Sequence, residues 1–200
     1  TFFDRIGMAG CLIAIVSILV PLLLIYFFVA PIIVENAAKK VSPEIEQQIG
    51  DAVFQSLTAN YETDTAKTRL VQQFYDSLGF GGDYKMRITV VNEPVVNAFA
   101  VPGGRIVVFD SILAIMDAPE QLAALLAHEA SHVQLKHSMR SIFRELASSL
   151  MFSLLLGDYG DLSVIIAQQG DELAGLSYSR KLELEADENG LRLMRENGIP

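Results

Sequence analysis

The sequence contains one cysteine in 200 residues and few basic side chains, since 15 Lys and Arg stand against 24 Asp and Glu for a net charge of -9. A single Cys excludes an internal disulfide framework and any CxxC or Cys–His zinc module. The acidic balance lacks the basic surface that phosphate backbones need, so we expect no nucleic-acid partner. The 14 Gly and 7 Pro follow no period and 51% of residues are hydrophobic, which excludes a collagen-like, coiled-coil or disordered chain.

Charge is absent from one long segment near the N-terminus. No Asp, Glu, Lys or Arg lies between Arg5 and Glu35. As a helix, residues 6–34 would extend about 43 Å, more than the roughly 30 Å of a bilayer core. We therefore interpret this segment as one transmembrane helix that contacts the lipid bilayer, kinked at Pro21. A cleaved signal peptide is the alternative, but the segment is long for one and no small-residue cleavage site follows it.

Two helices begin the globular part of the chain. Ser42 followed by Pro43 predicts a helix start, and apolar residues recur after it at i, i+4 spacing. A second helix is predicted from Thr65 to Leu78, where Gly79 stops it. Both have ordinary amphipathic patterns, so we interpret them as scaffold.

The apolar period changes to two after these helices. Residues 85–91, 95–101 and 105–109 are predicted as strands, the last two joined by a turn at Pro102-Gly103-Gly104. Their spacing predicts a small antiparallel sheet. With the flanking helices it gives an α+β fold class, a mainly helical domain preceded by one transmembrane helix.

Further helices follow the strands. Asp117 as N-cap, with Glu120 three positions later, predicts a helix start. The last helix is predicted from Ser179 to Glu196. Between these two helices, residues 146–156 are very apolar but too few to cross a bilayer, so we expect them in the core or in a hydrophobic lip beside the membrane.

The capped helix carries an HExxH pattern, His128-Glu129-Ala130-Ser131-His132. Residues i and i+4 of a helix are about 40° apart around its axis, so both imidazoles can face one ion with Glu129 beside them. This is half of a zinc site. The alternative, two histidines satisfied in a core with a solvated Glu between them, needs no metal.

A catalytic zinc ion takes three protein ligands and leaves one position open. The metzincin continuation of HExxH is excluded, because Leu135 and Ser138 stand where that class has Gly and His. His137 cannot supply the third ligand from the same helix, since it would lie about 180° round from His128. A surface histidine and a role near the substrate both remain open for it.

Carboxylates on the last helix are the remaining candidates for the third ligand. Glu183 and Asp187 are again an i, i+4 pair, whereas Glu185 would point about 200° away from Glu183 and is expected to be solvated. A ligating histidine usually donates its other ring N–H to a carboxylate. We therefore expect Glu183 to bind zinc and Asp187 to accept a hydrogen bond from a ligating histidine.

Three separated blocks of the sequence resemble the membrane-associated zinc metallopeptidases that include HtpX, the CAAX prenyl protease and the mitochondrial OMA-type peptidase. Order and spacing of the blocks agree with that family, and together with the segment between them they cover about half the chain. The blocks are Asn97-Ala98-Phe99-Ala100-Val101-Pro102-Gly103-Gly104, the HExxHxxxxH run from His128 to His137, and Ser179-Arg180-x-x-Glu183-x-Glu185-Ala186-Asp187-x-x-Gly190.

The resemblance implies a zincin-like fold and a role for each matched residue. It makes His128, His132 and Glu183 the ligands of one Zn²⁺ per chain, Glu129 the catalytic base and Asp187 a catalytic residue that is sometimes assigned as a proton donor. It further implies that an extended protein or peptide substrate binds the sheet edge at Asn97, Ala98, Phe99 and Ala100, as in strand addition. Tyr178, Arg180 and His137 are candidates to stabilise the oxyanion, as is a group beyond Pro200.

These implications give the expected organisation and function. Residues 1–36 form the transmembrane helix with its flanks, and residues 37–200 form the metallopeptidase domain, which we expect to be truncated at its C-terminus because the family continues past Gly190. The expected activity is endopeptidase hydrolysis through a zinc-activated water, in protein quality control. A noncatalytic zinc-binding chaperone or assembly factor using the same cleft is the alternative. By analogy we expect a bacterial inner membrane with the domain facing outward.

Overall fold

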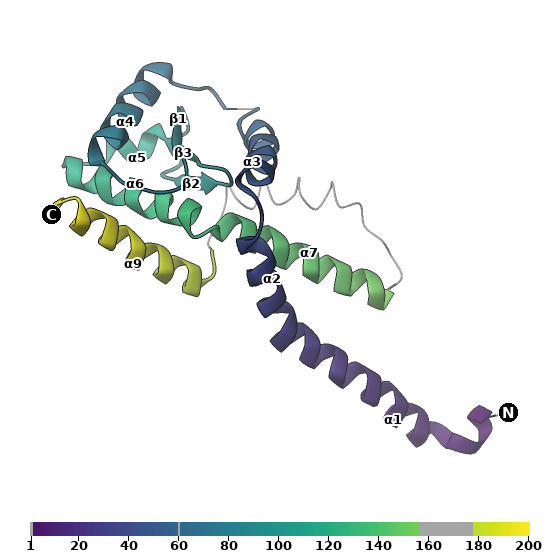
Figure 1. Cartoon of the computed structure of the whole chain (residues 1–200). Coiled ribbons are helices and arrows are strands. Elements are labelled where there is room, and N and C mark those ends of the chain that lie inside the picture. The colour runs from purple at the N-terminus through teal and green to yellow at the C-terminus, as the bar shows by residue number, and fades with distance from the viewer. Residues whose placement is uncertain (1, 60, 157–177) are drawn as a thin grey trace.

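A long helical arm leads into the domain of this computed structural model, which describes residues 2–59, 61–156 and 178–200. The arm consists of α1 (Phe2–Leu24), the π-helical segment η1 (Ile25–Val29) and α2 (Ala30–Lys39), and its α1 end projects away from the rest of the chain (Figure 1). Gly7, with φ 63°, is the non-helical residue that interrupts α1, whereas Pro21 stays within the helix.

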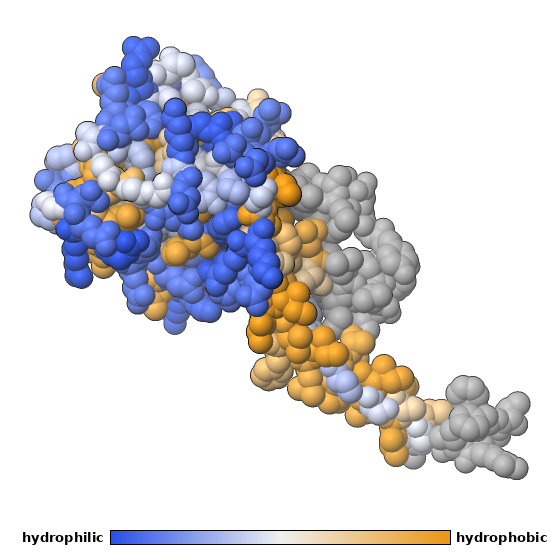
Figure 2. Space-filling view, in the orientation of Figure 1, coloured by the Kyte–Doolittle hydropathy of each residue, from blue (hydrophilic) through white to orange (hydrophobic). Residues whose placement is uncertain are grey.

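The arm has the composition and length of a membrane-spanning helix. Gly10–Lys39 is long and apolar enough to cross a bilayer, and none of its most apolar stretch is buried against the protein. In Figure 2 the hydrophobic colour follows the arm up to its junction with the domain, whose visible face is mostly hydrophilic. The prediction of one such helix at the N-terminus is confirmed.

Local capping signals place the first two helices of the domain. α3 (Pro43–Thr58) begins after Ser42, whose Oγ accepts the N–H of Ile45 at 3.4 Å. α4 (Thr65–Leu78) begins after Asp64, and Gly79 ends it in the left-handed conformation with φ 70°. Both predicted helices are confirmed.

The sheet is small, as predicted, but it is mixed and not wholly antiparallel. It contains β1 (Arg87–Val91), β2 (Ala98–Val101) and β3 (Arg105–Phe109) in the order β1-β3-β2. β2 and β3 form an antiparallel hairpin, whereas β1 pairs with β3 in parallel. The difference from the prediction has a topological reason. The segment after Val91 does not lead into a strand beside β1; β2 instead forms the other edge of the sheet, and β3 lies between β1 and β2.

Helices cover both faces of this sheet. Apolar residues of one face, such as Ile106 and Val108, pack with Val71 of α4 and Leu126 of the helix α6 (Pro119–Gln134). Residues of the other face, such as Val107 and Phe109, pack with α3 and with the first turns of the helix α7 (His137–Leu156). The alternation along β3 therefore divides the core into two layers.

The remaining elements position the candidate site. The short α5 (Asp110–Ala114) precedes α6, which begins one residue later than predicted because Ala118 is the N-cap and Gln121 Oε1 accepts the N–H of Asp117 at 2.8 Å. A break at Leu135 and Lys136, where Lys136 has φ 56°, separates α6 from α7. α7 then runs beside α2, and α9 (Arg180–Glu196) lies along α6 (Figure 1).

Candidate metal centre

The site is built where α9 packs closely on α6. Gly190 permits the approach, since a Cβ there would lie 3.3 Å from both the carbonyl carbon of Ala127 and the nitrogen of His128. Asn189 adds a partly buried link, donating from Nδ2 to Ser131 Oγ at 2.9 Å. The contact fixes one helix of the predicted site against the other.

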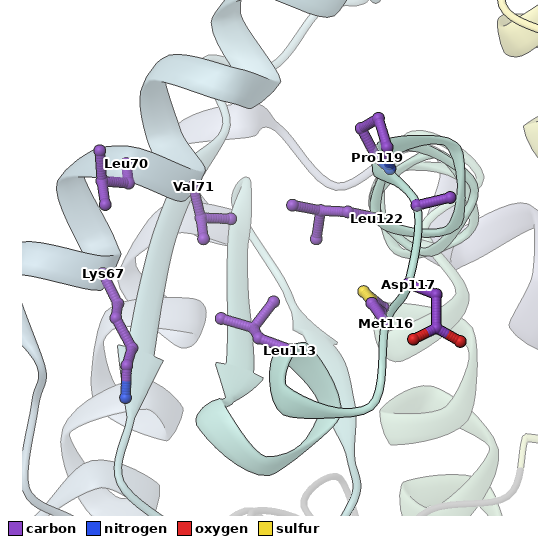
Figure 3. A pocket seen from close by; sticks show the side chains of 9 residues that line it. Lys67, Leu70, Val71, Leu113, Met116, Asp117, Pro119 and Leu122 are labelled. Atoms are coloured by element: carbon purple, nitrogen blue, oxygen red, sulfur yellow. The ribbon is translucent and has the colours of Figure 1, made fainter.

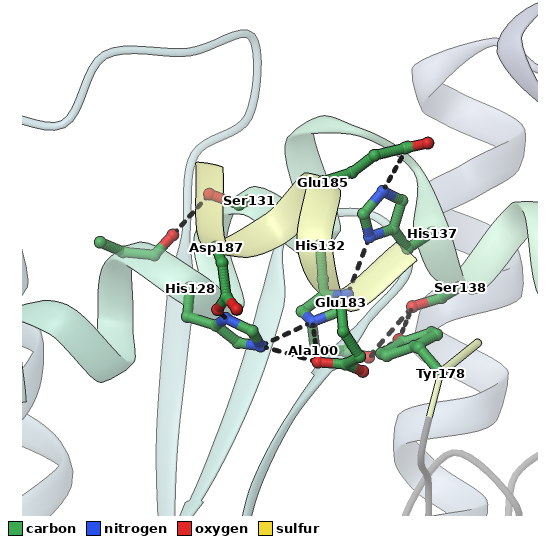
Figure 4. Close-up of polar contacts among 11 residues, drawn as sticks. Ala100, His128, Ser131, His132, His137, Ser138, Tyr178, Glu183, Glu185 and Asp187 are labelled. Carbon is green, nitrogen blue, oxygen red and sulfur yellow. Dashed lines mark hydrogen bonds and ion pairs between the residues drawn. The ribbon is translucent and has the colours of Figure 1, made fainter. Parts of the chain in front are cut away.

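Three side chains that could hold a metal ion converge between these helices (Figure 4). His128 Nε2 lies 2.9 Å from His132 Nε2 and 3.3 Å from Glu183 Oε2, and the second histidine is 3.8 Å from that oxygen. One donor atom from each residue falls within 4.8 Å of the other two. Two imidazole nitrogens and a carboxylate oxygen are a donor set that suits zinc.

Hydrogen bonds behind the histidines leave the facing nitrogens available. His128 Nδ1 lies 2.9 Å from Asp187 Oδ1, and a carboxylate only accepts, so the Nδ1–H of His128 donates and its Nε2 keeps a lone pair. His132 Nδ1 lies 2.9 Å from His137 Nδ1, and the far nitrogen of His137 is 3.3 Å from Glu185 Oε2. We assign the tautomers accordingly: His132 donates to His137, and His137 donates to Glu185.

His137 and Glu185 have roles that the sequence pattern missed. His137 is fully buried, and Arg140 Nη1 donates to Glu185 Oε2 at 2.6 Å. The expectation that Glu185 is simply solvated is therefore wrong: its side chain is 32% exposed, but its carboxylate is bound by Arg140 and His137. Arg140 holds the pKa of Glu185 below its usual value through a hydrogen bond and its charge. The angular argument about His137 assumed one continuous helix, whereas the break at Lys136 turns the imidazole back toward His132.

Glu129 lies beside the donor atoms and is almost fully buried, with 6% of its surface exposed. Burial raises its pKa to about 8, the negative charge of Glu183 acts in the same direction, and the backbone N–H of Ala100 partly opposes them. The carboxyl group is thus anchored by β2 and held where it can exchange a proton near neutral pH.

A cavity of about 270 Å³ opens in front of these residues. His128, Glu129, His132 and Glu183 form its polar wall. Apolar and strand residues complete it, namely Val96, Asn97, Ala98, Phe99, Ile112, Leu125 and Tyr178. Three of the four predicted substrate-binding residues therefore line the cavity, and Ala100 does not.

The backbone of Ala100 is bonded within the protein instead. Asn97 O accepts the N–H of Phe109, and the register makes Ala98 and Ala100 the residues whose backbone groups point away from β3. The N–H of Ala100 donates to the carboxyl group of Glu129, and the carbonyl of Ala100 accepts from Ser138 Oγ at 3.1 Å. An added strand would therefore have to begin at Ala98, on the outer edge of β2.

Of the candidates for oxyanion stabilisation, Tyr178 reaches the cavity. Its ring stacks on that of His132, with centroids 4.1 Å apart and planes 19° apart, and its hydroxyl lies 2.7 Å from Ser138 Oγ. His137 is buried behind His132, and Arg180 is not among the lining residues that the structure describes.

A second cavity, of about 420 Å³, lies between α4, the α5–α6 connection and the start of α6 (Figure 3). Its lining is mainly apolar, and Lys67 and Asp117 are its charged members. No histidine lines it, so the cavity beside HExxH is the candidate active site.

The geometry resembles that of HExxH metal-dependent hydrolases, because two histidines and a glutamate lie together as a group that could hold a metal ion. The match of residues 62–199 to the family model described as Peptidase family M48 agrees with it. The chain belongs to this peptidase family, as the resemblance in the sequence predicted.

Named relatives extend the comparison. The chain is 32% identical over 165 residues to mitochondrial metalloendopeptidase OMA1 of Schizosaccharomyces pombe, covering 81% of this chain and 47% of the relative. It is 24% identical over 181 residues to the beta-barrel assembly-enhancing protease of Escherichia coli, covering 82% of this chain and 37% of the relative. The chain thus spans less than half the length of these curated relatives.

Proposed function

We propose that this chain is a membrane-anchored, zinc-dependent endopeptidase that hydrolyses peptide bonds in protein substrates. The observation that carries the proposal is the convergence of His128, His132 and Glu183 with the buried Glu129 beside them. Membership of a peptidase family supports the reaction class.

The donor atoms fit a zinc ion with one position left for a substrate or water. His128 Nε2, His132 Nε2 and a carboxylate oxygen of Glu183 would hold it, and the tautomers assigned above leave both nitrogens free to bind. When bound, zinc would supply a Lewis acid that polarises the scissile carbonyl and lowers the pKa of water.

The residues around the donors would transfer protons, orient a ligand and stabilise the oxyanion. Glu129 would accept the proton of the attacking water at a carboxylate oxygen and give it to the leaving amine. Asp187 touches His128 and is 62% exposed, so its position favours orienting that ligand, with proton donation as the other proposed role. Tyr178 is the proposed oxyanion donor, since it lines the cavity and its ring stacks on His132. Its hydroxyl, which lies 2.7 Å from Ser138 Oγ, would have to turn toward the substrate.

The substrate would bind as an extended strand against the outer edge of β2. Asn97, Ala98 and Phe99 would line its path. The carbonyl of Ala98 points away from β3 and would accept from the substrate backbone, whereas the N–H of Ala98 donates to Asn97 Oδ1 at 2.9 Å and would have to exchange that partner. Ala100 would contribute by holding Glu129 and not by binding substrate. Backbone pairing makes few demands on sequence, which suits an enzyme that acts on misfolded chains.

The biological setting is proposed from the arm and from the relatives. Residues 1–36 would anchor the chain as a single-pass membrane protein, and residues 37–200 would form the peptidase domain. The names of the relatives mention a mitochondrial peptidase and the assembly of β-barrels, and we propose protein quality control at a membrane. We place it at a bacterial-type inner membrane with the domain on the outer side, which protease protection in oriented vesicles would test.

Metal removal and restoration test the proposed reaction. The purified chain should cleave unfolded casein, lose cleavage when a chelator strips the metal, and regain it with about one equivalent of zinc. A noncatalytic holder of chains would suppress aggregation of casein without producing fragments at any zinc level. That second result would replace the enzyme with a zinc-binding chaperone.

A further inference from the structure

The C-terminal half of α7 has the composition of a membrane segment without the length to cross a bilayer. After Arg144 and Glu145, the sequence carries no Asp, Glu, Lys or Arg until Asp158. Residues 146–156 between them are Leu-Ala-Ser-Ser-Leu-Met-Phe-Ser-Leu-Leu-Leu, and α7 continues as a helix through Leu156. A helix of this composition in water would expose a large apolar surface.

Where this half of α7 begins, Leu146 still packs against the core, and the next side chains, Ala147 and Ser148, lie against the arm. α2 and α7 run side by side (Figure 1), and a cavity of about 210 Å³ between the helices is lined by both. Tyr26, Phe27, Ala30, Pro31 and Val34 contribute from the arm, and Arg144, Ala147 and Ser148 from α7. The two helices thus form one hydrophobic unit.

Two polar contacts fix how far α7 reaches along the arm. Near the domain, Arg140 Nη2 lies 3.4 Å from Glu35 Oε1. Deeper in the arm, the hydroxyls of Tyr26 and Ser148 are 3.0 Å apart. Glu35 is the first charged residue after the apolar segment, so Tyr26 lies about 14 Å further along the helix at 1.5 Å per residue.

Ser148 therefore lies beside a part of the arm that is well inside the apolar segment. α7 continues for eight more residues, about 12 Å, in the direction away from the domain. Arg144 is exposed, one turn before Ser148, where its side chain can reach the headgroup layer.

We propose that residues 146–156 of α7 enter the same bilayer as the N-terminal arm, with lipid acyl chains covering the helix face that the arm leaves open. This inference rests on the proposed membrane anchoring by residues 6–34. It makes the membrane contact a two-helix unit in place of a single tether.

The unit would hold the active site close to the bilayer surface. His137 begins α7 and contacts the ligand His132, and it lies about 16 Å along the helix from Ser148. A rigid helix thus connects the metal site to the membrane, in contrast to a flexible tether. The substrates favoured by this arrangement are chain segments that emerge from the bilayer or lie on its surface.

Depth measurements with a fluorescent probe test the proposal in the full chain. Cys11→Ser provides a background without native thiols, and single cysteines at residues 151, 152, 153 and 154 carry an environment-sensitive dye. Four consecutive positions sample every face of a helix. Phe27, 65% exposed on the arm, is the membrane reference, and Leu70, 65% exposed on α4, is the aqueous reference.

The labelled proteins are reconstituted in phosphatidylcholine and phosphatidylglycerol vesicles with a nitroxide on the lipid acyl chain, and iodide is added to the water. We expect the acyl-chain nitroxide to quench at least one of residues 151–154 as strongly as residue 27, while iodide quenches residue 70 alone. Zinc content and casein cleavage of each labelled protein report whether it is folded.

Each other outcome overturns a defined claim. Quenching by lipid at residue 27 but at none of 151–154 leaves the anchor intact and overturns the inference. Protection of 151–154 from both quenchers means that protein covers the helix, which also overturns it. Iodide quenching at residue 27 overturns the anchor together with the inference, while retained cleavage would leave the proposed peptidase standing.

Discussion

His137 lies behind His132, and we expect it to orient this proposed metal ligand. It is fully buried, accepts a hydrogen bond from His132 and donates one to Glu185. Arg140 also donates to Glu185. His137→Leu removes the partner of His132 while keeping an apolar volume. Because outer hydrogen bonds fix a ligand's tautomer, zinc affinity should fall about 10- to 100-fold. Competition with a chromogenic chelator measures this change.

The conservative replacement provides the control. His137→Gln keeps an acceptor for His132 and a donor for Glu185, so it should recover part of the lost affinity. Equal zinc affinity in wild type and His137→Leu would contradict the orienting role. Unfolding of the metal-free proteins separates a binding defect from a folding defect.

Histidine burial also predicts how stability depends on pH. Burial and the charge of Arg140 lower the pKa of His137 to about 4 in the folded chain, below the usual 6.5. The unfolded chain therefore binds a proton more readily between these values, and the stability contributed by neutral His137 is lost as pH falls from about 6.5 toward 4.

We expect the denaturant midpoint of the chelator-treated protein to fall between pH 7 and pH 5, and to fall less in His137→Leu. Equilibrium unfolding followed by circular dichroism measures both midpoints. Parallel pH curves for the two proteins would show that another group governs the effect.

Among the elements, the break between α6 and α7 depends on a buried ion pair. Lys136 Nζ lies 3.1 Å from Glu46 Oε2 and donates to the carbonyl of Val41 at 2.9 Å, while Glu46 is 1% exposed and also accepts from Tyr84. Lys136→Met leaves a buried carboxylate without its cation. Loss of one partner of a buried pair costs about 3–5 kcal/mol.

Denaturant unfolding measures that cost. The double variant Lys136→Met with Glu46→Gln removes the charge as well as its partner, so it should regain part of the stability. If both variants unfold at the same denaturant concentration as wild type, the ion pair does not hold the break.

The close contact between α6 and α9 at Gly190 should also control metal binding. Gly190→Val places a branched side chain where a Cβ already meets the backbone of Ala127 and His128 at 3.3 Å. Overpacking of this kind costs about 1–3 kcal/mol, and it should push Glu183 and Asp187 away from His128. We expect loss of zinc binding and of casein cleavage.

Gly81→Ala is the matched control, because a Cβ there meets nothing within 4 Å. Calorimetric zinc titration of both variants tests the idea. Zinc binding by Gly190→Val at wild-type affinity would show that α9 can move without disturbing the donors.

Sequence patterns predicted these elements wherever the signal was local. Caps and apolar periods placed α3, α4 and α9 within a residue or two, and i, i+4 spacing identified which side chains of α6 and α9 could share an ion. The break at Lys136 was not predictable in this way, because neither Gly nor Pro marks it and the left-handed residue is held by the distant Glu46. The position of His137 and the partners of Glu185 follow from that break.

Topology was the other feature beyond local patterns. Alternation predicted three strands, but nothing in their spacing distinguished a meander from a sheet with β3 in the middle. The parallel pair β1–β3 depends on where the connecting segment packs. The buried backbone of Ala100, which anchors Glu129, is a consequence of the same arrangement.

At the scale of the whole molecule, one chain combines a hydrophobic arm, a two-sided core and a site at the α6–α9 contact (Figure 1). α7 connects all three, since it begins beside His132, packs against the sheet and continues along the arm. This continuity links the proposed peptidase to the proposed membrane surface.

The proposed mechanism requires Glu129 to act as a base beside a bound zinc ion. Glu129→Gln keeps the shape of the side chain but removes the basic oxygen, and Glu120→Gln makes the same change at an exposed position of the same helix. Casein cleavage and zinc content are measured on the same samples. Loss of a general base costs about 10²- to 10⁴-fold in rate.

We predict that Glu129→Gln loses cleavage by that factor with about one zinc per chain retained, while Glu120→Gln cleaves like wild type. Cleavage by Glu129→Gln at the wild-type rate, with zinc bound, would contradict the assignment of Glu129 and with it the proposed mechanism.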